Sequence, residues 1–318
     1  MTNFSNSYNR FVLGLEQINL SAAQTPEQFV SDMEKMYNQE ISNVTDYILG
    51  RKNKCRVVML AGPSGSGKTT TAHMIKNEME RRGIKAALIS LDDFYLGEGK
   101  APLAEDGKHD YEAVEALDIE AIKSCIFNLI EYGYCDMPTF NFPLKRPNEG
   151  KKHVELESNG IAIIEGIHAL NPIFTKNLPN HGLIKVYISV KQGISDYNGE
   201  ILSRTDMRFL RRLVRDYNHR KTDAEQTLDM WDNVCRGEKL YIHPFKRTSD
   251  VTINSIHIYE PCVLCHMAIP LLSEITESSP HFKFARRILS SVERFYPIEI
   301  SMVPEDSLLR EFIGGGIY

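Results

Sequence analysis

A short stretch rich in glycine and hydroxyl side chains has the spacing best suited to chemistry. Residues 62–69 read Gly-Pro-Ser-Gly-Ser-Gly-Lys-Thr, a pattern typical of a loop that wraps around phosphate groups. Glycines allow the tight turn that points backbone N–H groups at phosphate oxygens. In such a loop Lys68 reaches the β- and γ-phosphates, and the hydroxyl of Thr69 is a ligand of Mg²⁺. The phosphate contacts are predicted at Gly62, Ser64, Gly65, Ser66, Gly67, Lys68, Thr69 and Thr70.

The elements on either side of this loop support the same interpretation. An apolar run at 55–60 predicts a buried strand, and a helical pattern follows the loop and ends at Gly83. Strand, glycine-rich turn and helix is the context that a phosphate-binding loop needs, and the helix N-terminus favours anions. A chance Gly/Ser loop is the alternative, and both flanks speak against it.

Two acidic positions follow predicted strands. The apolar run 85–91 is followed by Asp92 and Asp93, and the run 160–166 contains Glu165 near its end. Ligands of open α/β sheets bind at the carboxyl ends of the strands. A carboxylate there can take a proton from an attacking hydroxyl, so Asp92 is our candidate base, with Asp93 in reserve. Glu165 is a candidate Mg²⁺ ligand through water; a capping acid is the alternative for Asp93 and Glu165.

A basic helix is predicted between Arg204 and Arg220. Four of its arginines fall on one helical face, at 204, 208, 211 and 215. Arginine suits the clamping of a polyphosphate, so the sequence favours a lid over the phosphates, although a solvated face is the usual alternative. We expect this segment to be mobile without nucleotide, because closely spaced like charges repel.

The order of elements predicts an α/β fold with a mostly parallel sheet flanked by helices. Residues 137–156 contain three prolines and partly alternating apolar residues, which predicts a β-hairpin excursion. Three parts are expected: an N-terminal helical extension (1–54), a central domain (55–258) and a C-terminal helical extension (259–318). The first part contains a helix from Thr25 to Gly50, whereas residues 1–24 are expected to be partly disordered or to lie over the core.

Composition excludes several classes of protein. The 318 residues carry a net charge of −5, which argues against a broad nucleic-acid-binding surface. No apolar run is long enough to span a membrane, and the start does not resemble a secretory signal. Cys262 and Cys265 lack a second pair for zinc and suggest reduced thiols in an apolar helix. We therefore expect a cytoplasmic protein; whether it forms a homo-oligomer is left open.

Four stretches together resemble the phosphoribulokinase/uridine kinase family. The resemblance covers about Cys55 to Ser255, and the segment 308–315 is similar to a bacterial subgroup of uridine kinases. The stretches are Gly62–Thr69, Asp92–Tyr95, Ile163–His168 and Arg211–Asp216. The resemblance implies a P-loop kinase that phosphorylates a nucleoside 5′-hydroxyl from ATP or GTP with Mg²⁺.

The resemblance also implies roles for individual residues. Asp92 matches the catalytic base, and Tyr95 matches an aromatic residue on the substrate side. Asp110 matches the acid that binds the ribose hydroxyls, and Arg212 matches a ribose-side arginine. Arg215 and Arg220 match lid arginines on the phosphates, with Arg215 as a catalytic group. Arg211 of the same helix is also expected to bind the nucleotide.

The residues expected to contact the base depart from the family pattern. Pyrimidine kinases of this family read the base with tyrosine, histidine, arginine and glutamine. The corresponding positions here are Phe140, Lys145, Thr222 and Met230. We therefore expect relaxed base choice or a nucleoside other than uridine. A kinase of another small alcohol, such as a sugar phosphate or pantothenate, and a non-catalytic nucleotide-binding regulator remain the alternatives.

Overall fold

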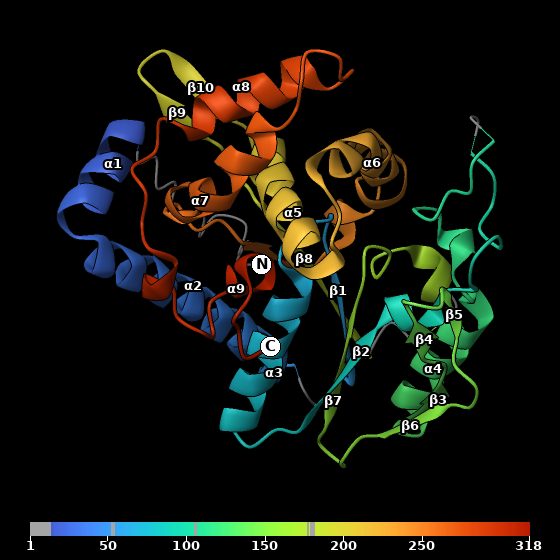
Figure 1. Cartoon of the computed structure of the whole chain (residues 1–318). Helices are drawn as coiled ribbons and strands as arrows, with labels where there is room; N and C mark the ends of the chain where they lie inside the picture. Colours follow the sequence, from blue (N-terminus) through green and yellow to red (C-terminus); the bar gives the residue numbers. More distant parts are fainter. Residues whose placement is uncertain (1–13, 52–54, 105–106, 177, 179–181) are drawn as a thin grey trace.

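A five-stranded parallel sheet forms the centre of the protein (Figure 1). The structure is a computed structural model that describes residues 14–51, 55–104, 107–176, 178 and 182–318. The strand order is β11-β8-β1-β7-β2. The bounds are β1 (Val57–Ala61), β2 (Ala86–Ser90), β7 (Ile161–Glu165), β8 (Leu183–Ser189) and β11 (Val251–Asn254). The mostly parallel sheet predicted from the sequence is confirmed.

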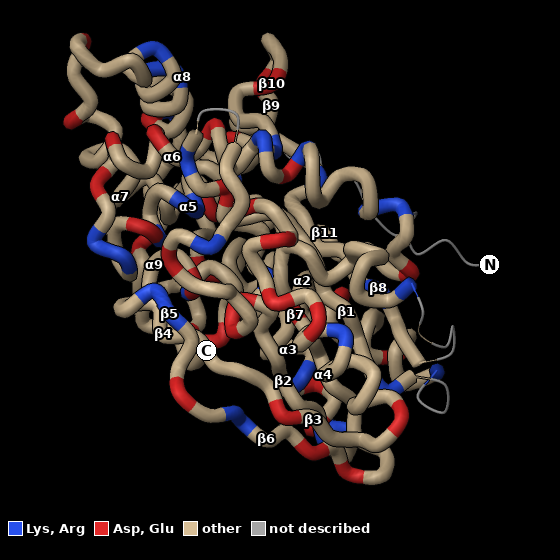
Figure 2. The backbone as a smooth tube through the Cα atoms, turned by 90° about the vertical axis from the view of Figure 1, so that its right-hand side faces the viewer, with Lys and Arg blue, Asp and Glu red and all other residues tan. Residues whose placement is uncertain are grey.

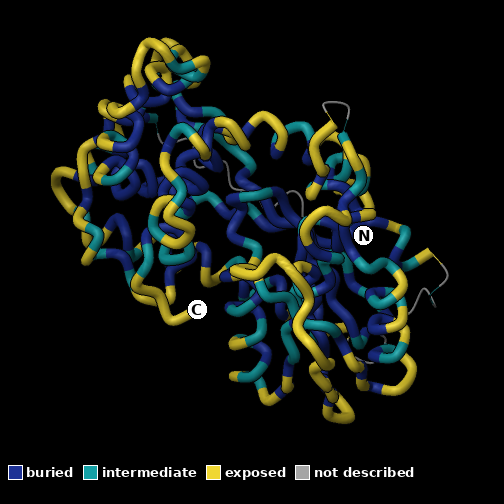
Figure 3. Tube along the Cα trace, turned by 45° about the vertical axis from the view of Figure 1, so that its right-hand side comes forward, coloured by how far each residue is buried: buried dark blue, intermediate teal, exposed yellow. Residues whose placement is uncertain are grey.

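The sheet is covered on both faces because its strands are apolar on both sides. Val58 and Leu60 of β1 face one hydrophobic cluster, and Val57 and Met59 face the other. The longer helices that contribute to the first cluster are α2 (Pro26–Leu49), α3 (Lys68–Arg81), α5 (Arg204–Arg220), α6 (Ala224–Gly237), α7 (Glu260–Ser273) and α8 (Phe282–Val292). Helix α4 (Ile119–Glu131) covers the opposite face. Figure 3 shows this buried centre and the exposed loops around it.

The N-terminal region is more regular than its sequence suggests. Helix α1 (Leu15–Gln24) precedes α2, and Pro26 occupies the first turn of α2 after the break at Thr25. The helix predicted for Thr25–Gly50 is confirmed. Of the two expectations for the region before this helix, disorder is wrong for residues 15–24 and packing over the core is confirmed, because α1 buries Leu15, Ile18 and Ala22 in the first cluster. Residues 1–13 lie outside the described part of the chain.

The hairpin excursion predicted at 137–156 is confirmed, and it begins a few residues earlier. Strand β3 (Tyr134–Met137) pairs with β6 (Lys152–Glu155), and β4 (Phe140–Asn141) pairs with β5 (Arg146–Pro147), both antiparallel. A second hairpin of β9 (Ile194–Asp196) and β10 (Gly199–Leu202) was not predicted. Helix α4 starts at Ile119, where the Asp118 side chain caps it by accepting from the Ala121 N–H.

Several short helical segments complete the chain. They are η3 (Leu91–Phe94), η4 (Val114–Ala116), η5 (Pro172–Phe174), η6 (Glu238–Ile242, a π-helical turn), η7 (Lys246–Thr248), η8 (Ile300–Met302) and α9 (Arg310–Ile313). One hydrophobic cluster contains Ile48 of α2, Leu60 of β1 and Phe312 of α9. The division at residues 54 and 258 therefore stays a prediction, since apolar packing runs across both boundaries.

Basic and acidic positions are interspersed along the chain in the view of Figure 2. None of the described helices is long and apolar enough to cross a membrane.

Candidate active site

The glycine-rich loop between β1 and α3 has the geometry that its sequence predicts. Gly65 and Gly67 have φ angles of 72° and 83°, in the left-handed region that favours glycine. A Cβ atom at Gly62 would lie 2.2 Å from the backbone oxygen of Ile188 on β8. These three positions therefore require glycine, two for backbone conformation and one for close packing against the sheet.

The residues after the loop occupy the first turn of α3. Lys68 begins this helix, and its Nζ donates to the Pro63 backbone oxygen at 3.4 Å. Thr69 is exposed to solvent, so its hydroxyl is accessible to a metal ion. Thr70 donates from its backbone N–H and its hydroxyl to the carboxylate of Glu311, a contact that the sequence did not suggest.

The acids predicted at the strand ends meet at the same edge of the sheet. The strand that precedes Asp92, β2, does not neighbour β1, because β7 lies between them. Glu165 of β7 is paired in register with Leu60 of β1 and with Ser90 of β2. Ser90 Oγ donates to Glu165 Oε1 at 2.8 Å, and the Asp92 N–H donates to Ser90 Oγ at 3.3 Å. Glu165 therefore links the loop to Asp92.

Burial and mutual repulsion make these acids less acidic than usual. Burial, then the Asp92 charge, raises the pKa of Glu165 from 4.5 to about 7. Enclosure by protein also raises the pKa of Asp92, although solvent reaches its side chain and Lys68 and Arg220 oppose the rise. The carboxylates of Asp92 and Glu165 and the hydroxyl of Thr69 are oxygen donors of the kind that Mg²⁺ prefers.

The arginines of α5 divide into two groups, and the first supports the loop from behind. Arg208 Nε donates to the Ser64 backbone oxygen at 3.0 Å, and its guanidinium pairs with Glu238. Arg211 is fully buried, donates to the Gly65 backbone oxygen at 3.2 Å and pairs with Glu260. The sequence placed Arg211 on the nucleotide, whereas its burial leaves it a supporting role. Arg204, expected on the same face, is exposed.

The second group of arginines surrounds one buried acid. Asp216 is fully buried and lies within ion-pair distance of Arg212 (3.1 Å), Arg215 (3.0 Å) and Arg220 (3.4 Å). Arg212 also donates to Ser64 Oγ at 2.9 Å. Asp216 partly offsets the mutual repulsion from which we expected a mobile lid, and α5 is a packed helix of the core. Sequence reasoning missed this acid, although its spacing of four residues from Arg212 and Arg220 was a usable signal.

The predicted ribose acid is buried in a polar network. Asp110 accepts from the Arg236 guanidinium at 2.9 Å and from the Tyr241 hydroxyl at 3.0 Å. Neither partner was identified from the sequence. His168 lies beside Tyr241, with ring centroids 6.0 Å apart, and burial lowers its pKa to about 4. Among the described residues, neither ring nitrogen of His168 has a hydrogen-bond partner of normal geometry. Buried polar atoms are usually paired, so a polar group of a ligand could bind there.

The aromatic residues expected on the substrate side come together. The rings of Tyr95 and Phe140 have centroids 5.9 Å apart, and the Tyr95 hydroxyl donates to the Tyr111 backbone oxygen. The Phe140 N–H donates to Asp93 at 3.2 Å, so Asp93, our reserve base, holds the hairpin.

The other residues at predicted base positions have different surroundings. Lys145 is exposed and pairs with Glu98 at 3.0 Å. Met230 exposes its side chain on α6, and Thr222 donates to the Arg220 backbone oxygen at 3.5 Å. The polar candidate for the base, Lys145, therefore already has an ionic partner on the protein surface.

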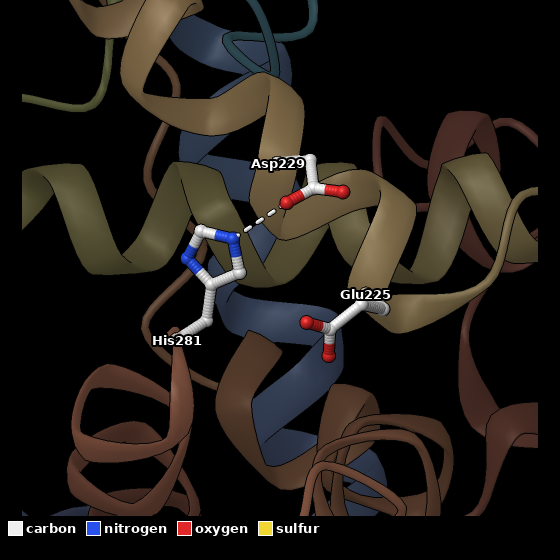
Figure 4. Close-up of side chains that lie close together, drawn as sticks. All are labelled: Glu225, Asp229 and His281. Carbon is white, nitrogen blue, oxygen red and sulfur yellow. Dashed lines mark hydrogen bonds and ion pairs between the residues drawn. The ribbon is translucent and has the colours of Figure 1, made fainter. Parts of the chain in front are cut away.

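A further group of ionisable side chains joins α6 to the segment before α8 (Figure 4). His281 Nε2 lies 2.7 Å from Asp229 Oδ1, and Glu225 accepts from the Ser279 hydroxyl at 2.6 Å. This is the one group of three or more His, Cys, Asp or Glu residues with metal-binding geometry among the described residues. The two hydrogen bonds account for the arrangement without an ion.

The fold and this site define a class: a P-loop protein with a parallel sheet that carries acids and arginines at the edge where the loop lies. Residues 57–260 match the phosphoribulokinase / uridine kinase family, and the chain belongs to that family. This confirms the resemblance seen in the sequence.

Curated relatives are similar over the same region. A uridine kinase from Clostridium botulinum (strain Okra / Type B1) is 27% identical over 198 residues, covering 62% of this chain and 86% of the relative. A uridine kinase from Anoxybacillus flavithermus is 29% identical over 204 residues, covering 64% and 87%. A solved structure of a possible uridine kinase from Bacillus stearothermophilus has 17% identity and a TM-score of 0.48, covering 68% of this chain and 97% of that one.

Proposed function

We propose that the protein transfers the γ-phosphate of ATP or GTP to the 5′-hydroxyl of a nucleoside in the cytoplasm. The observation that carries this proposal is the placement of Asp92. Its carboxyl lies at the carboxyl edge of the sheet, within electrostatic range of Lys68, Arg215 and Arg220. A proton acceptor beside three phosphate-binding cations is what transfer to an alcohol requires. The relatives named uridine kinase support the acceptor class.

Each group has a distinct part in the proposed transfer. Lys68 and the arginines Arg215 and Arg220 stabilise the negative charge that develops on the transferred phosphoryl group. Asp92 accepts the proton of the attacking hydroxyl, and its raised pKa makes it a stronger base than an ordinary aspartate. Mg²⁺, held by Thr69 and Glu165, would neutralise charge on the β- and γ-phosphates.

The acceptor side supports a ribonucleoside. Asp110 is buried and fixed by Arg236 and Tyr241, so its carboxylate is held rigidly where hydroxyl groups of a sugar could bind. Tyr95 and Phe140 offer aromatic surface to a base without reading its donors and acceptors. We therefore propose a nucleoside kinase with relaxed base choice or with a preferred base other than uracil.

The test is a screen for ATP consumption over ribonucleosides, deoxyribonucleosides and small alcohols, with Asp92→Asn as the key variant. We expect turnover with at least one ribonucleoside, and a loss of about 10²–10⁴-fold in Asp92→Asn with nearly unchanged ATP affinity. Asp93→Asn is the matched control, because Asp93 holds the Phe140 backbone and should affect turnover much less. Transfer only to a non-nucleoside alcohol would refute the acceptor, and an active Asp92→Asn protein would refute the base.

A further inference from the structure

The C-terminal segment 307–318 lies against the phosphate loop and the two helices beside it. Figure 1 shows α9 next to α3 and α5, although their sequences are far apart. A Cβ atom at Gly67 would lie 2.5 Å from Leu308 Cδ1, so Leu308 packs directly on the loop. Phe312 is fully buried, and the Arg211 guanidinium lies 5.2 Å from its ring centre. The segment is therefore a wall of the phosphate site.

One side chain of this segment occupies donors of the site itself. Glu311 Oε2 accepts from the Thr70 backbone N–H at 3.2 Å and from the Thr70 hydroxyl at 2.9 Å. Thr70 is the third residue of α3, so its N–H is one of the donors that the helix cannot satisfy internally. In a phosphate loop such donors bind nucleotide phosphates. A carboxylate is an anion with oxygens of comparable hydrogen-bonding capacity.

We propose that Glu311 is a built-in anion that takes the place of a nucleotide phosphate at Thr70 and is displaced when nucleotide binds. The inference rests on the proposed nucleotide site and adds a competitor within the chain. When nucleotide leaves, the carboxylate returns and satisfies both Thr70 donors. Glu311 thereby weakens nucleotide binding and favours release of the nucleoside diphosphate product.

The anchoring of the segment indicates that only the side chain of Glu311 moves. Asn218 Nδ2 donates to the Phe312 backbone oxygen at 3.1 Å, and the Ser307 hydroxyl donates to the buried Glu34 at 2.7 Å. Arg310 donates to the backbone oxygens of Gly314 (3.1 Å) and Pro304 (3.3 Å), which closes the segment on itself. These contacts lie on both sides of Glu311 and do not involve its carboxylate.

The glycines after α9 complete this closure. Gly314 and Gly315 have φ angles of 82° and 70°, so the chain turns there through conformations that other residues adopt at a cost. The turn returns the backbone to Arg310 and ends with Tyr318 stacked on His73 of α3, with ring centroids 5.5 Å apart. The glycine run therefore serves to fasten the end of the chain to the helix that carries Thr70.

The charge of Glu311 strengthens the competition. It adds a negative charge near Glu165 and Arg220, both of which respond to it electrostatically. An incoming phosphate must therefore replace two hydrogen bonds and also approach a like charge. An amide in place of the carboxylate removes the charge while keeping the size of the side chain.

The experiment measures binding of MgADP by calorimetry without any acceptor, for the wild type, Glu311→Gln and Glu311→Ala. Glu305→Gln is the matched control, because Glu305 lies two residues before this segment, carries the same charge and is exposed. We expect both Glu311 variants to bind MgADP about tenfold more tightly than the wild type. In the wild type, MgADP must break the hydrogen bonds between Thr70 and a charged carboxylate, whereas neither variant has a charged group at position 311. The control should stay within about twofold of the wild type.

Kinetics and stability separate the possible outcomes. ADP should dissociate more slowly from both Glu311 variants than from the wild type, with unfolding temperatures close to that of the wild type. Equal or weaker MgADP binding in Glu311→Gln would overturn the inference and make Glu311 a structural cap of α3. Because no acceptor is present, a protein that binds MgADP but phosphorylates no nucleoside would refute the proposed function and leave this inference standing. Failure of every form to bind MgADP would overturn both.

Discussion

Replacing Glu165 by glutamine should stabilise the protein in the absence of ligands, at the expense of activity. Glu165 is buried at the end of β7, and its pKa is raised from 4.5 to about 7. The folded state therefore holds this carboxylate at a higher free energy than the unfolded state does at neutral pH. A glutamine keeps an oxygen that can accept the Ser90 hydroxyl and carries no charge.

The magnitude and its pH dependence follow from the pKa. At 1.36 kcal/mol per unit of pKa, the rise corresponds to about 3 kcal/mol as an upper value, and we expect a gain of about 1–3 kcal/mol at pH 8. An acid whose folded pKa is raised gives its full stability below its unfolded pKa and loses it as pH rises through the folded pKa. The advantage of Glu165→Gln should therefore be small near pH 4.5 and complete above pH 7.

Urea unfolding at pH 5 and pH 8, without Mg²⁺ or nucleotide, measures this difference. Glu157→Gln is the control, because Glu157 is an exposed glutamate just before the same strand and should change stability by less than about 0.5 kcal/mol. Phosphoryl transfer should fall in Glu165→Gln, since the proposed Mg²⁺ site loses a carboxylate. A variant less stable than the wild type at pH 8, or equally stabilised at both pH values, would refute the reasoning.

Three further predictions follow. Lys68→Ala should abolish phosphoryl transfer while leaving the unfolding temperature nearly unchanged, because Lys68 serves charge stabilisation and not packing; near-normal turnover in a folded variant would contradict the mechanism. Asp216→Asn should cost about 3 kcal/mol in urea unfolding, because three arginines lose their common buried partner, whereas Asp229→Asn on the surface serves as the control. Relative kcat/KM values should show no preference for uridine and cytidine over adenosine and guanosine above about 10³-fold, and a larger preference for the pyrimidines would contradict the proposed base choice.

Local pattern was sufficient to predict the elements that hold the phosphate loop. The spacing of Gly62, Gly65 and Gly67 reflects backbone conformation and close packing, which act over a few residues and are visible in the sequence. The buried strands were equally visible as continuous apolar runs, because a parallel sheet covered on both faces needs apolar residues on both sides. Asp92 and Glu165 were found because strand ends in such a sheet bring acids to one edge.

Contacts between distant parts of the chain could not be predicted in the same way. Nothing local indicates that β7 inserts between β1 and β2, or that Glu311 reaches Thr70 across 241 positions. The role of Arg211 was misjudged for the same reason, since its partner Glu260 lies on another helix and makes burial of the charge tolerable. Helix α1 escaped notice because it buries few residues.

The balance of charges explains how one site can favour both a cation and a polyphosphate. Five of the six arginines of α5 are already paired within the protein, through Asp216, Glu238 and Glu260. Asp92 and Glu165 both have raised pKa values, although Lys68 and Arg220 oppose the rise at Asp92, and the charge of Asp92 repels that of Glu165. A divalent cation relieves the repulsion between these two carboxylates. Its positive charge also offsets the repulsion between the Glu311 carboxylate and an incoming phosphate. The ligand that suits the site electrostatically is therefore the complex of metal and nucleotide rather than either one alone.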